Sequence, residues 1–153
     1  MTRAACVLLA LLYLSLGSGI GSASAARAQS LVVIVNGAND VSDVSVHDLS
    51  RIYKLSRRRW PDGTPISLYL PPPTSDAAKL LATKLLKVGG EADMFTFYLR
   101  AIFRQKITAV PESVNAAPVA IERVATTLGG IALVDRDDVA ASERVRVIEV
   151  DGL

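Results

Sequence analysis

The sequence predicts an α/β sandwich, in which helices cover a mixed or parallel sheet. One observation is a continuous run of apolar, mostly β-branched residues at 31–35, which is typical of a strand covered on both faces. A second is the recurrence of apolar side chains at helical spacing in several segments between residues 45 and 128. A third is a pair of strand-like segments at 131–134 and 145–150.

The first 28 residues have the features of an export signal. Arg3 supplies a positive charge, and residues 4–16 form an apolar stretch that is shorter than the roughly 20 residues a membrane-spanning helix needs. Small residues and two Ala-x-Ala cleavage motifs follow, the second ending at Ala28. The sequence therefore predicts a cleaved signal at 1–28, a folded domain at 29–153 and a periplasmic or secreted location. A short uncleaved anchor is the alternative.

Removal of this signal changes what the composition implies. Of the 153 residues, 125 would remain after the 28 are removed, which is enough for one domain with its own core. The 17 Lys and Arg fall to 15 because Arg3 and Arg27 leave, and then equal the 15 Asp and Glu. A neutral domain argues against a nucleic-acid partner. Cys6 is the only cysteine and also leaves, so we expect neither a disulfide nor a thiolate metal site.

The first predicted helix spans residues 45–56. Ser45 and Asp48 match a capping box at its start, with Asp in place of the usual Glu. Trp-Pro-Asp-Gly at 60–63 is turn chemistry, and residues 66–70 alternate as a half-buried strand.

Three more helices are predicted. Thr74-Ser75-Asp76 can cap a helix that runs to about residue 88, where Gly89-Gly90 ends it. Another spans 91–104, and the last spans 118–128 with a proline in its first turn. The spacing in the 91–104 helix predicts that six side chains face the core: Met94, Phe95, Tyr98, Leu99, Ile102 and Phe103.

Three motifs follow one another in a characteristic order. A strand ending in Val-Asn precedes Ser-x-x-Asp-Leu-Ser-Arg-Ile-Tyr-Lys at 45–54, and Arg-Trp-Pro-Asp-Gly-Thr-Pro-Ile follows at 59–66. Leu-Gly-Gly-Ile-Ala-Leu-Val at 128–134 is similar to a Pro-Gly-Ala-Ile-Gly-Tyr-Val segment. Together the motifs resemble the substrate-binding proteins of phosphate ABC transporters, which are type II periplasmic binding proteins.

The resemblance implies both a fold and a function. Full-length members of the family hold an oxyanion between two lobes, whereas this shorter chain corresponds to a single-lobe form with a mixed sheet. It implies an exported, non-enzymatic protein without a cofactor that binds phosphate or a similar oxyanion for ABC-type uptake, with a transporter as partner. The alternative is a ligand-free interaction module of the cell envelope. Such a module would dock onto an envelope protein, or self-associate through the face that a second lobe covers in relatives.

The resemblance also indicates where a ligand would bind. The family's anion loop carries an Arg before Gly-Ser-Gly-Thr at a helix start, where free N–H groups hold phosphate. In the matching stretch, 70–76, Thr74 and Ser75 keep hydroxyls, but the Arg and both glycines are absent and Asp76 adds a negative charge. Thr74 and Ser75 are therefore the candidate ligand-binding residues. Simple helix capping is the alternative.

A basic run lies next to a tryptophan. Within 54–59, Arg58 and Arg59 precede Trp60 and are candidate cations for phosphate, an acidic partner or anionic lipid headgroups. The alternative is a solvated loop in which an arginine stacks on the indole ring.

The sequence contains no pattern for catalysis or metal binding. His47 is the only histidine, and no Gly-x-Ser-x-Gly motif accompanies it. Asp135, Asp137 and Asp138 lack the central Gly and distal Glu of a calcium loop, so we interpret them as capping a turn.

Overall fold

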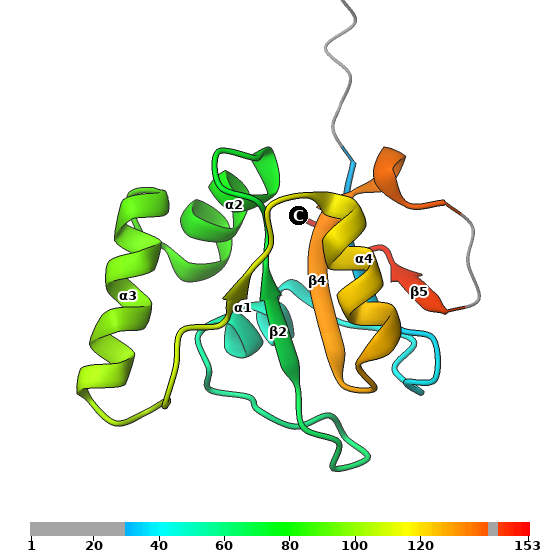
Figure 1. Cartoon of the computed structure of the whole chain (residues 1–153), viewed down its shortest axis with the longest axis horizontal. Coiled ribbons are helices and arrows are strands. Elements are labelled where there is room, and N and C mark those ends of the chain that lie inside the picture. The colour runs from blue at the N-terminus through cyan, green and yellow to red at the C-terminus, as the bar shows by residue number, and fades with distance from the viewer. Residues whose placement is uncertain (1–29, 141–143) are drawn as a thin grey trace, which may run out of the picture.

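A five-stranded mixed sheet forms the centre of the fold, in the order β3-β2-β4-β1-β5 (Figure 1). The computed structural model describes residues 30–140 and 144–153, so the predicted signal at 1–28 lies outside the described residues. The strands are β1 (Leu31–Asn36), β2 (Ser67–Leu70), β3 (Glu112–Ser113), β4 (Gly130–Asp135) and β5 (Val145–Ile148). Strand β1 is antiparallel to β4 and β5, whereas β2 is parallel to β3 and β4. The predicted α/β fold with a mixed sheet is confirmed.

Helices cover both faces of this sheet. They are α1 (Val46–Tyr53), α2 (Asp76–Leu80), the π-helical segment η1 (Leu81–Leu86), α3 (Glu91–Phe103), α4 (Ala117–Thr126) and the 3₁₀ turn η2 (Arg136–Asp138). The predicted cap of the first helix is confirmed, because the Ser45 hydroxyl accepts a hydrogen bond from the Asp48 N–H at 3.0 Å.

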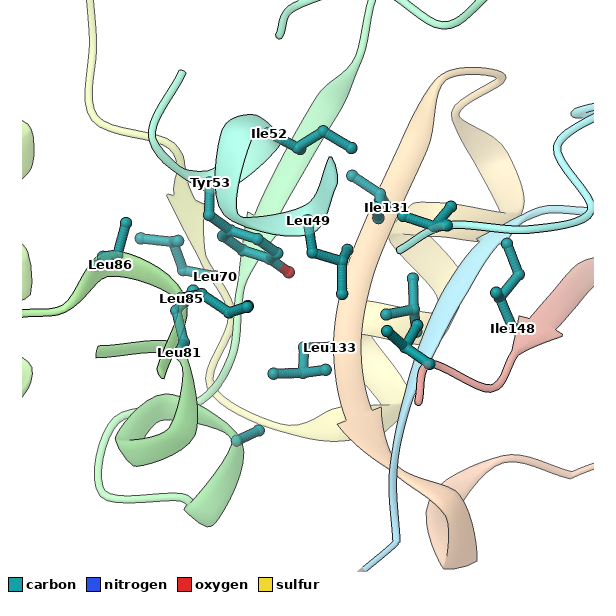
Figure 2. Close-up of a cluster of buried hydrophobic side chains, with 14 of the residues drawn as sticks. Leu49, Ile52, Tyr53, Leu70, Leu81, Leu85, Leu86, Ile131, Leu133 and Ile148 are labelled. Atoms are coloured by element: carbon teal, nitrogen blue, oxygen red, sulfur yellow. The ribbon is translucent and has the colours of Figure 1, made fainter. Parts of the chain in front are cut away.

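Strand β1 separates two core clusters. Val33 and Val35 belong to the cluster under α1, η1 and α3, whereas Val32 and Ile34 belong to the cluster under α4. Figure 2 shows the first cluster, in which side chains from α1, η1 and the sheet meet. Because alternate side chains point to opposite faces, a strand buried on both must be apolar at every position.

Asn36 connects the end of β1 to α4. Its side chain is 7% exposed, and its amide donates to the carbonyls of Val124 and Ala125 at 2.9 and 3.0 Å. Its carbonyl oxygen accepts from the Ala38 N–H at 3.0 Å. The side chain therefore satisfies carbonyl groups in the last turn of a helix, which have no partner within the helix itself.

The helix after β2 ends earlier than predicted. The α-helical turns of α2 change to the π-helical η1 at Leu81, and the helix ends at Leu86. Lys87 then takes a left-handed conformation with a φ of 59°, and the N–H of Val88 donates to the carbonyl of Ala82 at 2.9 Å. The chain thus leaves the helix before Gly89, and the glycines are not its cap.

Helix α3 buries only part of the predicted face: the prediction is confirmed for Met94 and Tyr98 but not for Phe95 and Phe103. Met94, Tyr98 and Ala101 are buried, and the Tyr98 hydroxyl donates to the Tyr53 carbonyl at 3.0 Å. Phe95 and Phe103 are instead 57% and 83% exposed, so placing them in the core was wrong. Apolar residues occur on more than one side of this helix, and spacing alone does not tell which side faces the core. Four residues form what we term the apolar face of α3: Phe95, Leu99, Ile102 and Phe103.

Hydrogen bonds join the turn before β2 to the residue that precedes β4. The Trp60 indole N–H donates to the Gly129 carbonyl at 3.2 Å, and the Ser67 N–H donates to the same oxygen at 3.0 Å. A Cβ atom on Gly129 would lie 1.8 Å from the Pro65 carbonyl oxygen. The Trp-containing turn and the Gly-Gly segment, two motifs far apart in the sequence, therefore meet in space, and only glycine fits between them.

We expect Gly129→Ala to destabilise the protein by at least about 2 kcal/mol, because the added methyl group forces the two backbones apart. The urea midpoint of the purified protein measures this loss. Gly90→Ala is the matched control, since its Cβ would meet nothing within 4 Å and its φ of 171° suits any residue. Equal stability of the two variants would contradict the close packing at Gly129.

Candidate functional site

The stretch after β2 opens onto a pocket of about 350 Å³, which we term the α2 pocket. Its lining includes residues that follow β2 and the last three residues of β4, and α2 lies at this end of the sheet (Figure 1). Its polar and charged lining residues are Thr74, Ser75, Asp76, Lys79, Asp135 and Asp138. Two of the predicted ligand-binding residues, Thr74 and Ser75, therefore do line one pocket.

The polar groups of Thr74 and Ser75 already have partners. The Ser75 hydroxyl accepts from the Ala78 N–H at 3.1 Å and donates to the Pro72 carbonyl at 2.6 Å. Thr74 has a left-handed backbone with a φ of 63°, and its N–H donates to the Glu91 carboxylate. These contacts are those of a helix cap, and they leave few donors for a ligand.

The charges around the α2 pocket oppose an anion. Asp76, Asp135 and Asp138 line it, and Lys79 is the one lining cation among the described residues. The Lys79 ammonium lies 3.0 Å from Asp76 Oδ1, so part of its charge is already balanced. An oxyanion bound here would meet more negative than positive charge.

Arg58 and Arg59 lie elsewhere, in the loop that leads into the start of β2, whereas Thr74 and Ser75 follow the end of that strand. Arg58 donates to the carbonyls of Leu55 and Lys106, and Arg59 donates to the Gly63 carbonyl at 2.8 Å. Because β2 separates the loop before it from the loop after it, the structure does not bring these arginines to Thr74 and Ser75.

The position of Trp60 agrees neither with a ligand site beside its ring nor with an arginine stacked on it. Trp60 is 3% exposed and packs in the core, so it offers no ring face to a ligand or to an arginine on the surface. The expected Pro-Asp turn is present, because the Gly63 N–H donates to the Trp60 carbonyl at 3.0 Å and Gly63 has a φ of 90°.

Arg57, the first arginine of the run, forms an ion pair with α1. Its guanidinium lies 2.9 Å from Asp48 Oδ1, and both side chains are partly buried. The hydrogen bond from the Ser45 hydroxyl, and then the charge of Arg57, hold the pKa of the Asp48 carboxyl below 3.8. The pair joins the start of α1 to the loop that follows its end.

The described residues contain no group of three or more His, Cys, Asp and Glu that could hold a metal ion. Asp137 and Asp138 lie in the 3₁₀ turn after β4, and Asp135 precedes its first residue without a side-chain capping hydrogen bond, so the position of these residues in a turn agrees with the prediction but the cap itself is not observed. His47 is exposed on α1. Within 30–140 and 144–153, no helix is long and apolar enough to cross a membrane.

Sequence reasoning missed a second pocket, which lies between the ends of α1 and α3. This α1–α3 pocket has a volume of about 170 Å³, and its lining residues are Lys54, Leu55, Phe97, Arg100, Ala101, Arg104 and Lys106. A signal was present, because Arg100 and Arg104 are four residues apart and so share one side of a helix. Their proximity to Lys54 depends on how α1 and α3 pack, which local spacing does not reveal.

The sequence matches no known family profile and no curated protein. The structure, however, is similar to an ABC-type phosphate transport receptor from Vibrio cholerae, with a TM-score of 0.57 and 15% identity over 80% of this chain and 47% of that chain. It is also similar to PstS from Borrelia burgdorferi, with a TM-score of 0.58 and 12% identity over 80% of this chain and 47% of that chain.

These identities show the fold alone. The chain has the α/β fold of a single lobe of phosphate-type substrate-binding proteins, and it spans less than half the length of the two matched structures. The resemblance of the sequence motifs to that family is confirmed at this level.

We expect Asp48→Asn to cost up to about 1 kcal/mol of stability at neutral pH, because a partly exposed ion pair contributes little more. Since folding lowers the pKa of Asp48, the carboxylate stabilises the native state above about pH 4, and this contribution is lost as pH falls further. Urea unfolding of both proteins at several pH values should show the difference shrinking toward acid. Asp43→Asn, which removes an exposed carboxylate before α1, is the control. A difference independent of pH would exclude the charged pair as its cause.

Proposed function

We propose that this protein is an exported, non-enzymatic domain with the binding-protein fold that acts in the cell envelope as a protein-interaction module. The apolar face of α3 carries the proposal. Phe103 is 83% exposed and Phe95 57% exposed, although large aromatic side chains gain free energy when they leave water. None of the four residues of this face packs against either core cluster. Contiguous exposed apolar residues of this kind mark sites of protein association.

The α2 pocket supports the same proposal because its lining disfavours the alternative, the binding of an oxyanion. Its acidic lining and its occupied hydroxyl and N–H groups disfavour the oxyanion that the anion loop of the family holds. A lobe that retains its fold but no longer binds the ligand can still bind a partner protein through another surface. The proposed export rests on the signal predicted at 1–28. The proposed absence of catalysis is supported by one structural neighbour, which is a transport receptor and not an enzyme.

We expect a photo-crosslinking residue at position 103 to capture a discrete protein adduct in intact cells. Phe95→Gln should weaken this adduct, because it removes apolar contact area on the same face. A crosslinker at Arg146, which is exposed on β5, is the control. An adduct of twice the mass of the chain identifies a second copy, and any other discrete mass identifies an envelope partner. Identical patterns from positions 103 and 146 would exclude α3 as the interface.

Uptake of phosphate or a similar oxyanion, with an ABC transporter as partner, is the second candidate function. It is favoured by one structural neighbour, an ABC-type phosphate transport receptor, and by the hydroxyls of Thr74 and Ser75 at the α2 pocket. In this function the ligand contacts Thr74 and Ser75. Arg58 and Arg59 lie in the loop before β2, at the other end of that strand, and do not complete the site. Lys79 is the described cation that lines the pocket.

Calorimetric titration with phosphate distinguishes the two functions when it is performed on the unchanged protein and on the variants Asp76→Asn and Ser75→Ala. If the protein serves in uptake, Asp76→Asn should strengthen phosphate binding, because the substitution removes a carboxylate from the pocket and releases Lys79 from its ion pair. Uptake also requires Ser75→Ala to weaken binding by about 1 kcal/mol, the value of one hydrogen bond. The interaction module requires that neither substitution alters phosphate binding, and this is the result we expect. Thermal melting verifies that Ser75→Ala, which removes a helix cap, is folded at the titration temperature.

A further inference from the structure

We propose that the α1–α3 pocket binds a phosphate group, and that its cations Lys54, Arg100, Arg104 and Lys106 hold it. This inference is independent of the protein interface proposed for the apolar face of α3. The pocket has a volume of about 170 Å³, and its remaining lining residues, Leu55, Phe97 and Ala101, are apolar. None of the acidic residues that the structure describes lines it.

Within the part of the chain that the structure describes, the side chains of these four cations make no hydrogen bond or ion pair, unlike those of most other Lys and Arg residues. Side-chain hydrogen bonds or ion pairs engage Arg57, Arg58, Arg59, Lys79, Lys84, Arg123, Arg136, Arg144 and Arg146. Among the described residues, six cations have no such contact: Arg51, Lys54, Lys87, Arg100, Arg104 and Lys106. Four of these six line one small pocket. Like charges gathered without counter-charges repel one another, and a bound anion would relieve that repulsion.

The backbone around the pocket brings these side chains together. Leu55 and Gln105 have left-handed conformations, with φ values of 62° and 55°, just after α1 and α3 end. The Lys106 N–H then donates to the Ala101 carbonyl at 2.9 Å, which folds the chain back over the last turn of α3. The guanidinium of Arg58 donates to the Lys106 carbonyl, so a fifth cation lies at the rim.

The ends of the two helices do not account for so much positive charge. A helix C-terminus carries roughly half a negative charge, so α1 and α3 together offset about one of the four cations. The remaining charge suits a ligand that carries more than one negative charge. A phosphate group provides this, and its several oxygens accept hydrogen bonds from guanidinium and ammonium groups at once. A single carboxylate would leave most of the excess charge unbalanced.

Free phosphate and the phosphomonoester headgroup of phosphatidic acid share this chemistry, and two measurements distinguish them. Calorimetric titration with inorganic phosphate tests the free ion. Sedimentation with phosphatidic acid-containing vesicles, compared with pure phosphatidylcholine vesicles, tests the headgroup. Arg100→Gln with Arg104→Gln should weaken whichever binding is observed by about tenfold or more, because two charge-assisted contacts are lost. Both positions are exposed on a helix that glutamine suits, so we expect the variant to fold.

Lys84→Gln with Arg146→Gln removes the same charge from exposed positions outside the pocket and should change binding less than twofold, or about 0.4 kcal/mol. Loss of phosphate binding in the pocket variant alone supports a free anion, and loss of vesicle binding alone supports the headgroup. The proposal is overturned if neither probe binds, or if the two double variants weaken binding equally. Phosphate binding that responds only to Ser75→Ala would also overturn it and would instead support uptake through the α2 pocket.

Discussion

The carbonyl group of Gly129 is the point on which the arrangement of the sheet depends. It accepts hydrogen bonds from the Trp60 indole and from the Ser67 backbone, so one oxygen fixes both the turn before β2 and the first residue of β2. Strand β2 is thereby held beside β4 in the parallel register that pairs Ser67 with Gly130. The α2 pocket is lined in part by the segment that follows β2, and the α1–α3 pocket in part by Lys54 and Leu55, which begin the segment that precedes it. The position of β2 therefore bears on both pockets.

The parts of the fold that the sequence predicts well are those that depend on local chemistry. The apolar run of β1, the Ser45 cap and the Trp-Pro-Asp-Gly turn each follow from the side chains involved and their immediate neighbours. The order of these segments was sufficient to indicate the fold, although the sequence matches no curated protein. Apolar clusters on both faces of the sheet form the core.

The candidate sites were predicted less well because they depend on distant packing. Thr74 and Ser75 line a pocket, but two of the acidic residues beside them, Asp135 and Asp138, come from the end of β4 and the turn after it, some sixty positions later in the sequence. The separation of Arg58 from Thr74 follows from the direction of β2 and not from either motif. Helix α3 has apolar residues on two sides, and its packing against the core through Met94 and Tyr98 selects the side that is buried.

The positions of the two pockets also give the neutral domain an electrical polarity. Among the described residues, Asp76, Asp135 and Asp138 line the α2 pocket, whereas four cations without ion-pair partners, Lys54, Arg100, Arg104 and Lys106, line the α1–α3 pocket. Such a charge distribution is a dipole, which a uniform net charge of zero conceals. In the field of a negatively charged surface the molecule rotates before it makes contact, so that its cationic end leads. This orientation weakens as ionic strength rises, since the field of the surface extends only about 10 Å at 0.1 M salt.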